Sequence, residues 1–169
     1  MPELPVATAF WTPKPDLYKG AVAEDFIKHY ETRVAEGATV AGKAMFVCSN
    51  RNIAYDFYKI VKELRPKWTE KKICDDGVVL SEKDKKELKP MEKIKLVMTR
   101  NKDDEKDLFD MLGTKEDRKE FDRQFKNPKS NFKIAIVVDM WLTGFDVPEL
   151  DTIYICLLYT SPSPRDPKT

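Results

Sequence analysis

The chain has 169 residues, of which 41% are hydrophobic and 35% charged, and this suits one globular domain of ordinary size. Its 30 basic and 29 acidic residues leave a formal net charge of +1, so no overall field attracts it to nucleic acid and any DNA contact must be local. No apolar stretch approaches the roughly 20 residues that span a bilayer, and the first residues lack the pattern of a signal peptide, so we expect no membrane contact.

The first half of the sequence predicts two helices and one strand. Residues 1–20 contain four prolines and no sustained period, which is typical of a linker or arm. Residues 21–36 carry one apolar stripe and predict a helix. Residues 43–48 form a short, continuously apolar run, as expected of a strand buried on both faces in a parallel sheet. Residues 52–64 show the clearest helical period, which Pro66 ends.

The next segment is rich in lysine and acidic residues. Residues 68–93 predict a surface insertion, partly disordered, with Ile73 and residues 78–80 as its apolar anchors. Its lysines alternate with acidic residues and favour a solvated face over a DNA contact. Trp68 is expected to close the end of a helix against the core, although it could stack on a base. Residues 94–98 predict a second strand.

The last predicted elements complete an alternating pattern. Thr114 to Asp117 have the form of a capping box and open a helix that Pro128 ends. Residues 133–139 predict a strand that is apolar on both faces, and residues 152–155 predict one more. The order α-β-α-β-α-β-β indicates an α/β domain over residues 21–155, with a parallel sheet and right-handed crossovers.

Residues 156–169 break this pattern. Residues 156–166 read Cys-Leu-Leu-Tyr-Thr-Ser-Pro-Ser-Pro-Arg-Asp and match, in one frame, the translation of a transposase-based sequencing adapter. We therefore expect residues 156–169 to be a non-native tail and the domain to be truncated. A disordered tail rich in proline and serine is the alternative that composition supports.

The three cysteines and the one histidine do not indicate a metal centre. The three cysteines, Cys48, Cys74 and Cys156, fit neither metal spacing nor a disulfide framework, and free thiols favour the cytoplasm. His29, the one histidine, falls on the polar side of the first helix. A surface role is favoured there because zinc needs three or four converging ligands. We predict no catalytic residue and no metal ligand.

The segment after the 133–139 strand is the best candidate for a ligand-binding site, since ligands of parallel sheets bind beyond the carboxyl ends of the strands. Gly144 permits a tight turn and close approach of backbone to a ligand. Thr143 can hold a phosphate, and Asp146 supplies an acceptor. Thr-Gly-x-Asp alone is a weak signal, and a simple turn explains it equally well.

The longer string Val-Val-Asp-Met-Trp-Leu-Thr-Gly-Phe-Asp-Val-Pro, residues 137–148, resembles motif V of the motor (R) subunit of type I restriction endonucleases, a superfamily 2 helicase-like translocase. Residues 42–48 with Arg51 resemble its motif IV, and residues 94–99 resemble its next strand. The resemblance covers about residues 23–155. It implies the second of two RecA-like (P-loop NTPase-like) lobes, here a partial parallel sheet with flanking helices that is truncated before its last strands.

The resemblance also implies roles for particular residues. Gly144 and Asp146 would face the ATP cleft between the lobes, whereas Thr143 would face DNA phosphate. Asn50 and Arg51 would contact phosphate at the motif IV loop without reading sequence. Asn50 stands where the family usually has serine. Trp141 is expected to pack and position the motif V loop. The implied partners are duplex DNA, the methylation and specificity subunits, and the first RecA-like lobe.

The chain contains no Gly-x-x-x-x-Gly-Lys-Ser/Thr phosphate loop and no acidic magnesium box. The arginine-bearing motif VI and the nuclease carboxylates of the family are absent from it too. We therefore expect ATP and Mg²⁺ to act in the parent enzyme, and neither to bind this chain alone. Two other functions stay open: the second lobe of another superfamily 2 helicase or translocase, and a non-catalytic α/β interaction module.

Overall fold

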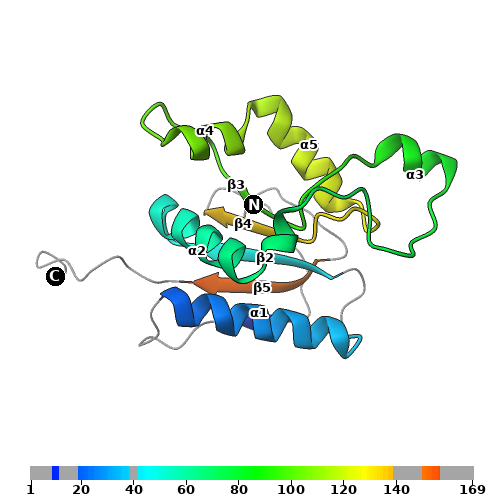
Figure 1. Ribbon diagram of the computed structural model, residues 1–169, viewed down its shortest axis with the longest axis horizontal. Coiled ribbons are helices and arrows are strands. Elements are labelled where there is room, and N and C mark those ends of the chain that lie inside the picture. Colours follow the sequence, from blue (N-terminus) through cyan, green and yellow to red (C-terminus); the bar gives the residue numbers. More distant parts are fainter. Residues whose placement is uncertain (1–8, 12–18, 39–41, 139–149, 157–169) are drawn as a thin grey trace, which may run out of the picture.

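A parallel sheet organises the molecule. The computed structural model describes residues 9–11, 19–38, 42–138 and 150–156. Within them the sheet has five strands, all parallel, in the order β1-β5-β2-β4-β3 (Figure 1). Their bounds are β1 Ala9–Trp11, β2 Lys43–Cys48, β3 Ile94–Val97, β4 Ile134–Val138 and β5 Leu150–Cys156. The predicted α/β class with a parallel sheet is confirmed, in keeping with a partial RecA-like lobe.

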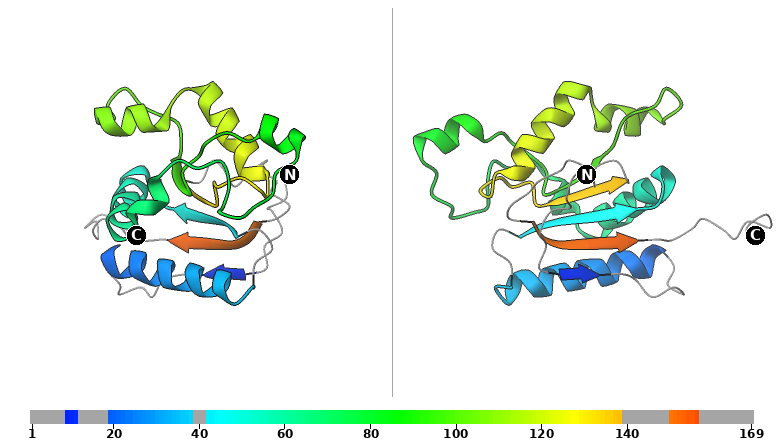
Figure 2. Two further views of the ribbon diagram at one scale, coloured as in Figure 1. Left: turned by 45° about the vertical axis from the view of Figure 1, so that its right-hand side comes forward. Right: turned by 180° about the vertical axis from the view of Figure 1, so that it is seen from behind.

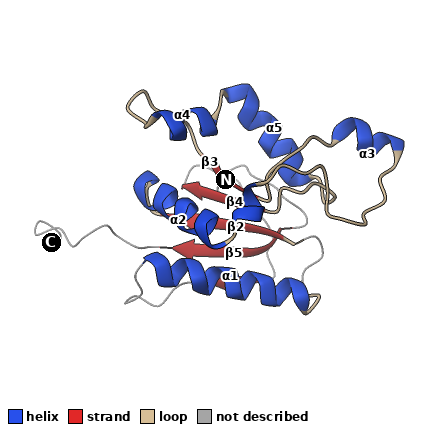
Figure 3. Ribbon diagram, in the orientation of Figure 1, coloured by secondary structure: helices blue, strands red, loops and turns tan. Residues whose placement is uncertain are grey.

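Helices connect and cover the strands. They are α1 Lys19–Ala35, α2 Arg51–Leu64, the short 3-10 helix η1 Pro66–Thr69, α3 Glu82–Glu87, α4 Lys106–Leu112 and α5 Lys115–Lys126. Helices α1 and α2 cover one face of the sheet (Figure 2), whereas α3 projects away from it (Figure 3). No helix in the described part of the chain is both long and apolar enough to cross a membrane.

Strand β2 explains why the sequence run 43–48 lacks alternation. All six of its residues are buried, because β4 and β5 pair with its two edges and side chains pack on both faces. Phe46 points into the core under α1 and α2, where its ring stacks on Phe57 with centroids 3.7 Å apart. Met45 belongs to the opposite cluster, together with Phe125 and Phe132. A strand that is enclosed in this way must be apolar throughout.

Helix α1 is fixed to β5 by polar contacts. Arg33 forms an ion pair with Asp151, 3.0 Å from nitrogen to oxygen. His29 Nδ1 lies 2.8 Å from the hydroxyl of Tyr154, so this half-buried histidine helps to dock the helix. Burial first, and then the charge of Arg33, lower the pKa of His29. No group of three or more His, Cys, Asp or Glu side chains in the described residues could hold a metal ion.

The predicted insertion, residues 68–93, differs from expectation. It follows a described path that includes α3, and Lys72 and Met91 form an isolated antiparallel bridge. Its expected anchors are wrong: Ile73 and Val79 are 43% and 87% exposed. Trp68 is buried, as expected of a side chain that packs against the core, and the other buried apolar residues are Leu88 and Met91. These side chains are single apolar positions among charges, so no periodicity marks them in the sequence.

Two further elements were not predicted. The interval 1–20, read as a linker or arm, contains β1, which pairs with β5 through Ala9↔Thr152 to Trp11↔Tyr154. Three residues are too few to show a strand period. Residues 101–107 are rich in charge and predict a solvated stretch, but the chain there enters α4, whose Leu108 and Leu112 are buried. Of the predicted tail, Cys156 is the last residue of β5, and residues 157–169 lie outside the described part.

The stacked aromatic pair under α2 gives a stability prediction. Phe46→Ala removes a fully buried ring and should lower the free energy of unfolding by about 3–5 kcal/mol, since the cavity adds to the lost transfer energy. Val79→Ala, at a side chain 87% exposed, is the matched control and should change it by less than about 0.5 kcal/mol. Urea unfolding followed by circular dichroism measures both. Equal losses of unfolding free energy in the two variants would show that Phe46 of β2 is not part of the core.

Candidate nucleic-acid interface at the carboxyl edge of the sheet

The register of the central strands brings several loops to one edge. Cys48, the last residue of β2, pairs with Val138, the last residue of β4. Val97, which ends β3, pairs with Val137. Because the strands are parallel, the chain leaves all three at the same edge of the sheet, where ligands of such sheets bind. Ser49 to Arg51 follow β2 there, and Thr99 to Asp104 follow β3.

Asn50 begins α2 as its N-cap. Its backbone is extended (φ −153°, ψ 170°), and its side-chain oxygen accepts a hydrogen bond of 2.9 Å from the Ile53 N–H. This satisfies one of the N–H groups that a helix leaves unpaired at its first turn. The carboxamide oxygen is thus already hydrogen-bonded to the first turn of α2. The amide nitrogen is the part of Asn50 that can donate to an anion.

Arg51 ties two loops of this edge together. One terminal nitrogen of its guanidinium donates to the backbone oxygen of Thr99. The other lies 2.6 Å from each of the two carboxylate oxygens of Asp104. The Arg51 side chain is 29% exposed and that of Asp104 is 9% exposed. The predicted phosphate ligand therefore already has an anionic partner within the chain.

Asp104 is held by its own loop as well. Its carboxylate accepts a 2.7 Å hydrogen bond from the Asn101 N–H, and its backbone N–H donates to the Asn101 carbonyl. Burial of the carboxyl favours its neutral form, but the hydrogen bonds from Arg51 and Asn101 outweigh this, so the pKa of Asp104 lies below its ordinary value. Asp104 is accordingly a positioned carboxylate anion at neutral pH.

Sequence reasoning missed a second arginine at this edge. Arg100 follows β3, and its guanidinium carbon lies 4.0 Å from the centroid of the Phe109 ring, a cation–π geometry. The signal was present, since polar residues directly follow the apolar run 94–98. Arg51 and Arg100 thus bring two cations to the edge, of which one is neutralised by Asp104.

The predicted motif V residues lie outside the described part of the chain. Thr143, Gly144 and Asp146, together with Trp141, fall within residues 139–149, which connect the carboxyl end of β4 to the amino end of β5. Their roles remain predictions. The described strand ends show only that this segment begins at the same edge as Asn50 and Arg51.

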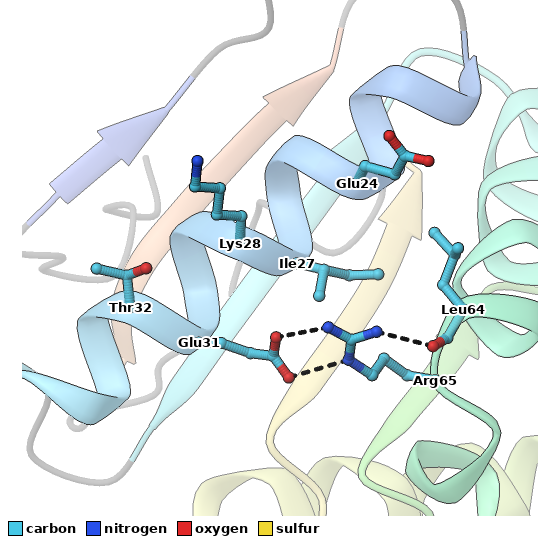
Figure 4. A pocket seen from close by; sticks show the side chains of 7 residues that line it. All are labelled: Glu24, Ile27, Lys28, Glu31, Thr32, Leu64 and Arg65. Carbon is cyan, nitrogen blue, oxygen red and sulfur yellow. Dashed lines mark hydrogen bonds and ion pairs between the residues drawn. The ribbon is translucent and has the colours of Figure 1, made fainter.

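A separate pocket lies between α1 and the end of α2, on the face of the sheet that these two helices cover (Figure 4). Its cavity volume is about 250 Å³, and it is lined by Glu24, Ile27, Lys28, Glu31, Thr32, Leu64 and Arg65. Glu31 and Arg65 form an ion pair of 2.8 Å within it, and the hydrogen bond from Arg65 lowers the pKa of Glu31. This pocket contains none of the predicted site residues.

Comparison with known proteins identifies relatives of one kind. The family model for domain 3 of the type I restriction enzyme R subunit matches residues 40–157. The chain is 34% identical over 134 residues to the HindI type I restriction enzyme endonuclease subunit of Haemophilus influenzae, covering 79% of this chain. It is 35% identical over 138 residues, 81% of the chain, to the putative MjaIXP type I restriction enzyme endonuclease subunit of Methanocaldococcus jannaschii. The chain spans 11% of the length of each relative. No solved structure matches it.

The cap of α2 can be tested separately from any ligand. Asn50→Ala should lower the free energy of unfolding by about 1 kcal/mol, because the Ile53 N–H loses its acceptor, whereas Asn50→Ser should stay within about 0.5 kcal/mol of the native chain. Asn52→Ala, at an exposed position two residues further along the chain, controls for the loss of an amide. Denaturant midpoints measure all three. A serine variant as unstable as the alanine variant would rule out the capping role.

Proposed function

The chain belongs to the type I restriction enzyme R subunit family, in the part described as domain 3, and we propose that it is a piece of the ATP-dependent, DNA-translocating subunit of a type I restriction endonuclease. In this proposal the domain is the second of two RecA-like lobes. Family membership favours it over the second lobe of another superfamily 2 helicase and over a non-catalytic interaction module.

One observation carries the proposal: β2 and β4 end side by side in register. The motif IV residues Asn50 and Arg51 and the segment that holds motif V therefore start from one edge of the sheet. Two segments 90 residues apart can act on one ligand only if the fold brings them together in this way. A sheet that placed them at opposite ends would have excluded a shared site.

Within this site we assign DNA phosphate to three residues. Asn50 donates through its amide nitrogen, Arg51 through its guanidinium and Thr143 through its hydroxyl. Such contacts hold the backbone without reading sequence, as a protein that moves along DNA requires. The net charge of +1 is consistent with a few short-range contacts of this kind, since the chain has no broad positive field.

ATP and Mg²⁺ belong to the parent enzyme in this proposal. Gly144 and Asp146 face the nucleotide from the second lobe, whereas the phosphate-binding loop and the magnesium ligands come from the first lobe. The further partners are duplex DNA and the methylation and specificity subunits. A nucleotide held between two lobes needs charge compensation from both sides, so this chain supplies one wall of the cleft, in a cytoplasmic complex.

The assignment of phosphate contacts predicts a specific loss of DNA affinity. Arg51→Gln and Thr143→Val should each weaken binding of a labelled duplex, and Arg51→Gln should reduce the slope of log K against log salt by about 1, because one phosphate contact is lost. Fluorescence anisotropy at several salt concentrations measures both effects.

Lys62→Gln is the matched control for this experiment. It removes one exposed positive charge from the last turn of the same helix, about 16 Å from Arg51 at 1.5 Å per residue. The proposal requires Lys62→Gln to affect binding less than Arg51→Gln does. Equal effects would mean that DNA senses net charge and not this edge of the sheet.

The division of ATP binding between two lobes predicts that the chain alone does not hydrolyse ATP. The 169-residue chain should release no phosphate from ATP above background, with or without duplex DNA, because the phosphate loop and magnesium ligands are absent from its sequence. A coupled phosphate-release assay measures this. Turnover that DNA stimulates and that Asp146→Asn abolishes would contradict the proposal.

A further inference from the structure

The ion pair between Arg51 and Asp104 occupies one terminal nitrogen of the guanidinium. This nitrogen, Nη2, lies 2.6 Å from each carboxylate oxygen of Asp104, whereas Nη1 donates to the Thr99 carbonyl. A phosphodiester also presents two oxygens that share a negative charge, and arginine binds carboxylates and phosphates through the same N–H groups. The carboxylate thus holds a nitrogen that a DNA phosphate could also bind.

The two partners differ in how firmly they are held. Asp104 keeps its place through the Asn101 N–H as well as through Arg51, so its loop does not depend on the ion pair alone. Arg51 keeps 29% of its side chain exposed, and incoming anions can reach it from solvent. A phosphate that arrives from the exposed side of Arg51 replaces one anionic acceptor by another, so the guanidinium is not left unpaired during the exchange.

From this geometry we propose that Asp104 is an internal competitor of DNA phosphate for Arg51, and so sets the DNA affinity of this edge. The inference rests on the proposed function of Arg51 as a phosphate ligand. In the free chain the carboxylate holds the guanidinium. On binding, a phosphate takes over part or all of this contact, and Asp104 retains its bond to the Asn101 N–H.

Neutralising the competitor tests the proposal. Asp104→Asn keeps an oxygen that can accept from the Asn101 N–H but removes the charge that holds Arg51. Binding of a fluorescein-labelled duplex of about 20 base pairs should tighten by about threefold to tenfold in low salt. Arg51→Gln in the same chain should abolish this gain, since the competitor acts only through Arg51.

Asp110→Asn is the matched control. It removes one negative charge from an exposed carboxylate of α4, which pairs with Lys106 and not with Arg51, and it should tighten binding by less than about twofold. All variants are compared at a temperature at which circular dichroism shows each of them folded. Should Asp104→Asn fail to fold, Asp104→Ser replaces it, because the hydroxyl can also accept from the Asn101 N–H.

The outcomes separate the two proposals. If Asp104→Asn binds no more tightly than Asp110→Asn while Arg51→Gln still weakens binding, competition is overturned and the phosphate contact stands. If Arg51→Gln leaves the affinity of the native chain unchanged, the phosphate contact itself fails, and competition fails with it. A gain in Asp104→Asn that persists in the double variant with Arg51→Gln also overturns competition, since the effect then bypasses Arg51.

Discussion

The burial of β2 from all sides is the constraint on which the rest of the structure depends. Its two edges pair with β4 and β5, and its two faces pack into separate apolar clusters. A shift of one residue would exchange Phe46 with Met45 between these faces, so the register is strongly specified. That register also decides where β2 and β4 end. The candidate interface is therefore a consequence of core packing, and loop sequence alone did not create it.

The two ends of the strands use their charged residues differently. At the amino end, Lys43 is fully buried and donates to the Phe132 carbonyl at 2.6 Å. Lys133 donates to the Pro128 carbonyl and pairs with Asp75 at 3.7 Å. These cations are enclosed by the chain's own loops and stabilise them. At the carboxyl end, Arg51 is partly exposed. Arg51 is therefore more open to a ligand than Lys43 or Lys133.

How far the sequence predicts this molecule depends on the range of each interaction. The central strands and α2 were predictable because apolar runs and helical periods are local patterns. The N-cap role of Asn50 was not predicted, because the expected helix began at residue 52 and α2 begins at Arg51. The pairing of Arg51 with Asp104 was not predictable, because 53 positions separate the partners and only the crossover between β2 and β3 brings them together.

The insertion shows the same limit from another side. Trp68 was expected to pack against the core, but Leu88 and Met91 are buried as well, although charged residues surround them in sequence. Burial against a distant element leaves no periodic trace. The motif V residues Thr143, Gly144 and Asp146 are a different case, because they lie outside the described residues. Their roles come from the resemblance alone and stay predictions.

Under the proposed function, the near-neutral charge of the chain and the ion pair of Arg51 are consistent with each other. Without a positive field, any DNA affinity must come from a few short-range contacts. A guanidinium left without an anion would be poorly ordered, whereas one sealed in a dry ion pair would be costly to release. Arg51 lies between these limits, ordered by a carboxylate that its own loop positions and open to solvent on one side. Such an arrangement fixes the direction of the guanidinium in advance and keeps its exchange between anions inexpensive. If the proposed function holds, the contact must form and break repeatedly along a phosphate backbone, and such a contact needs both properties.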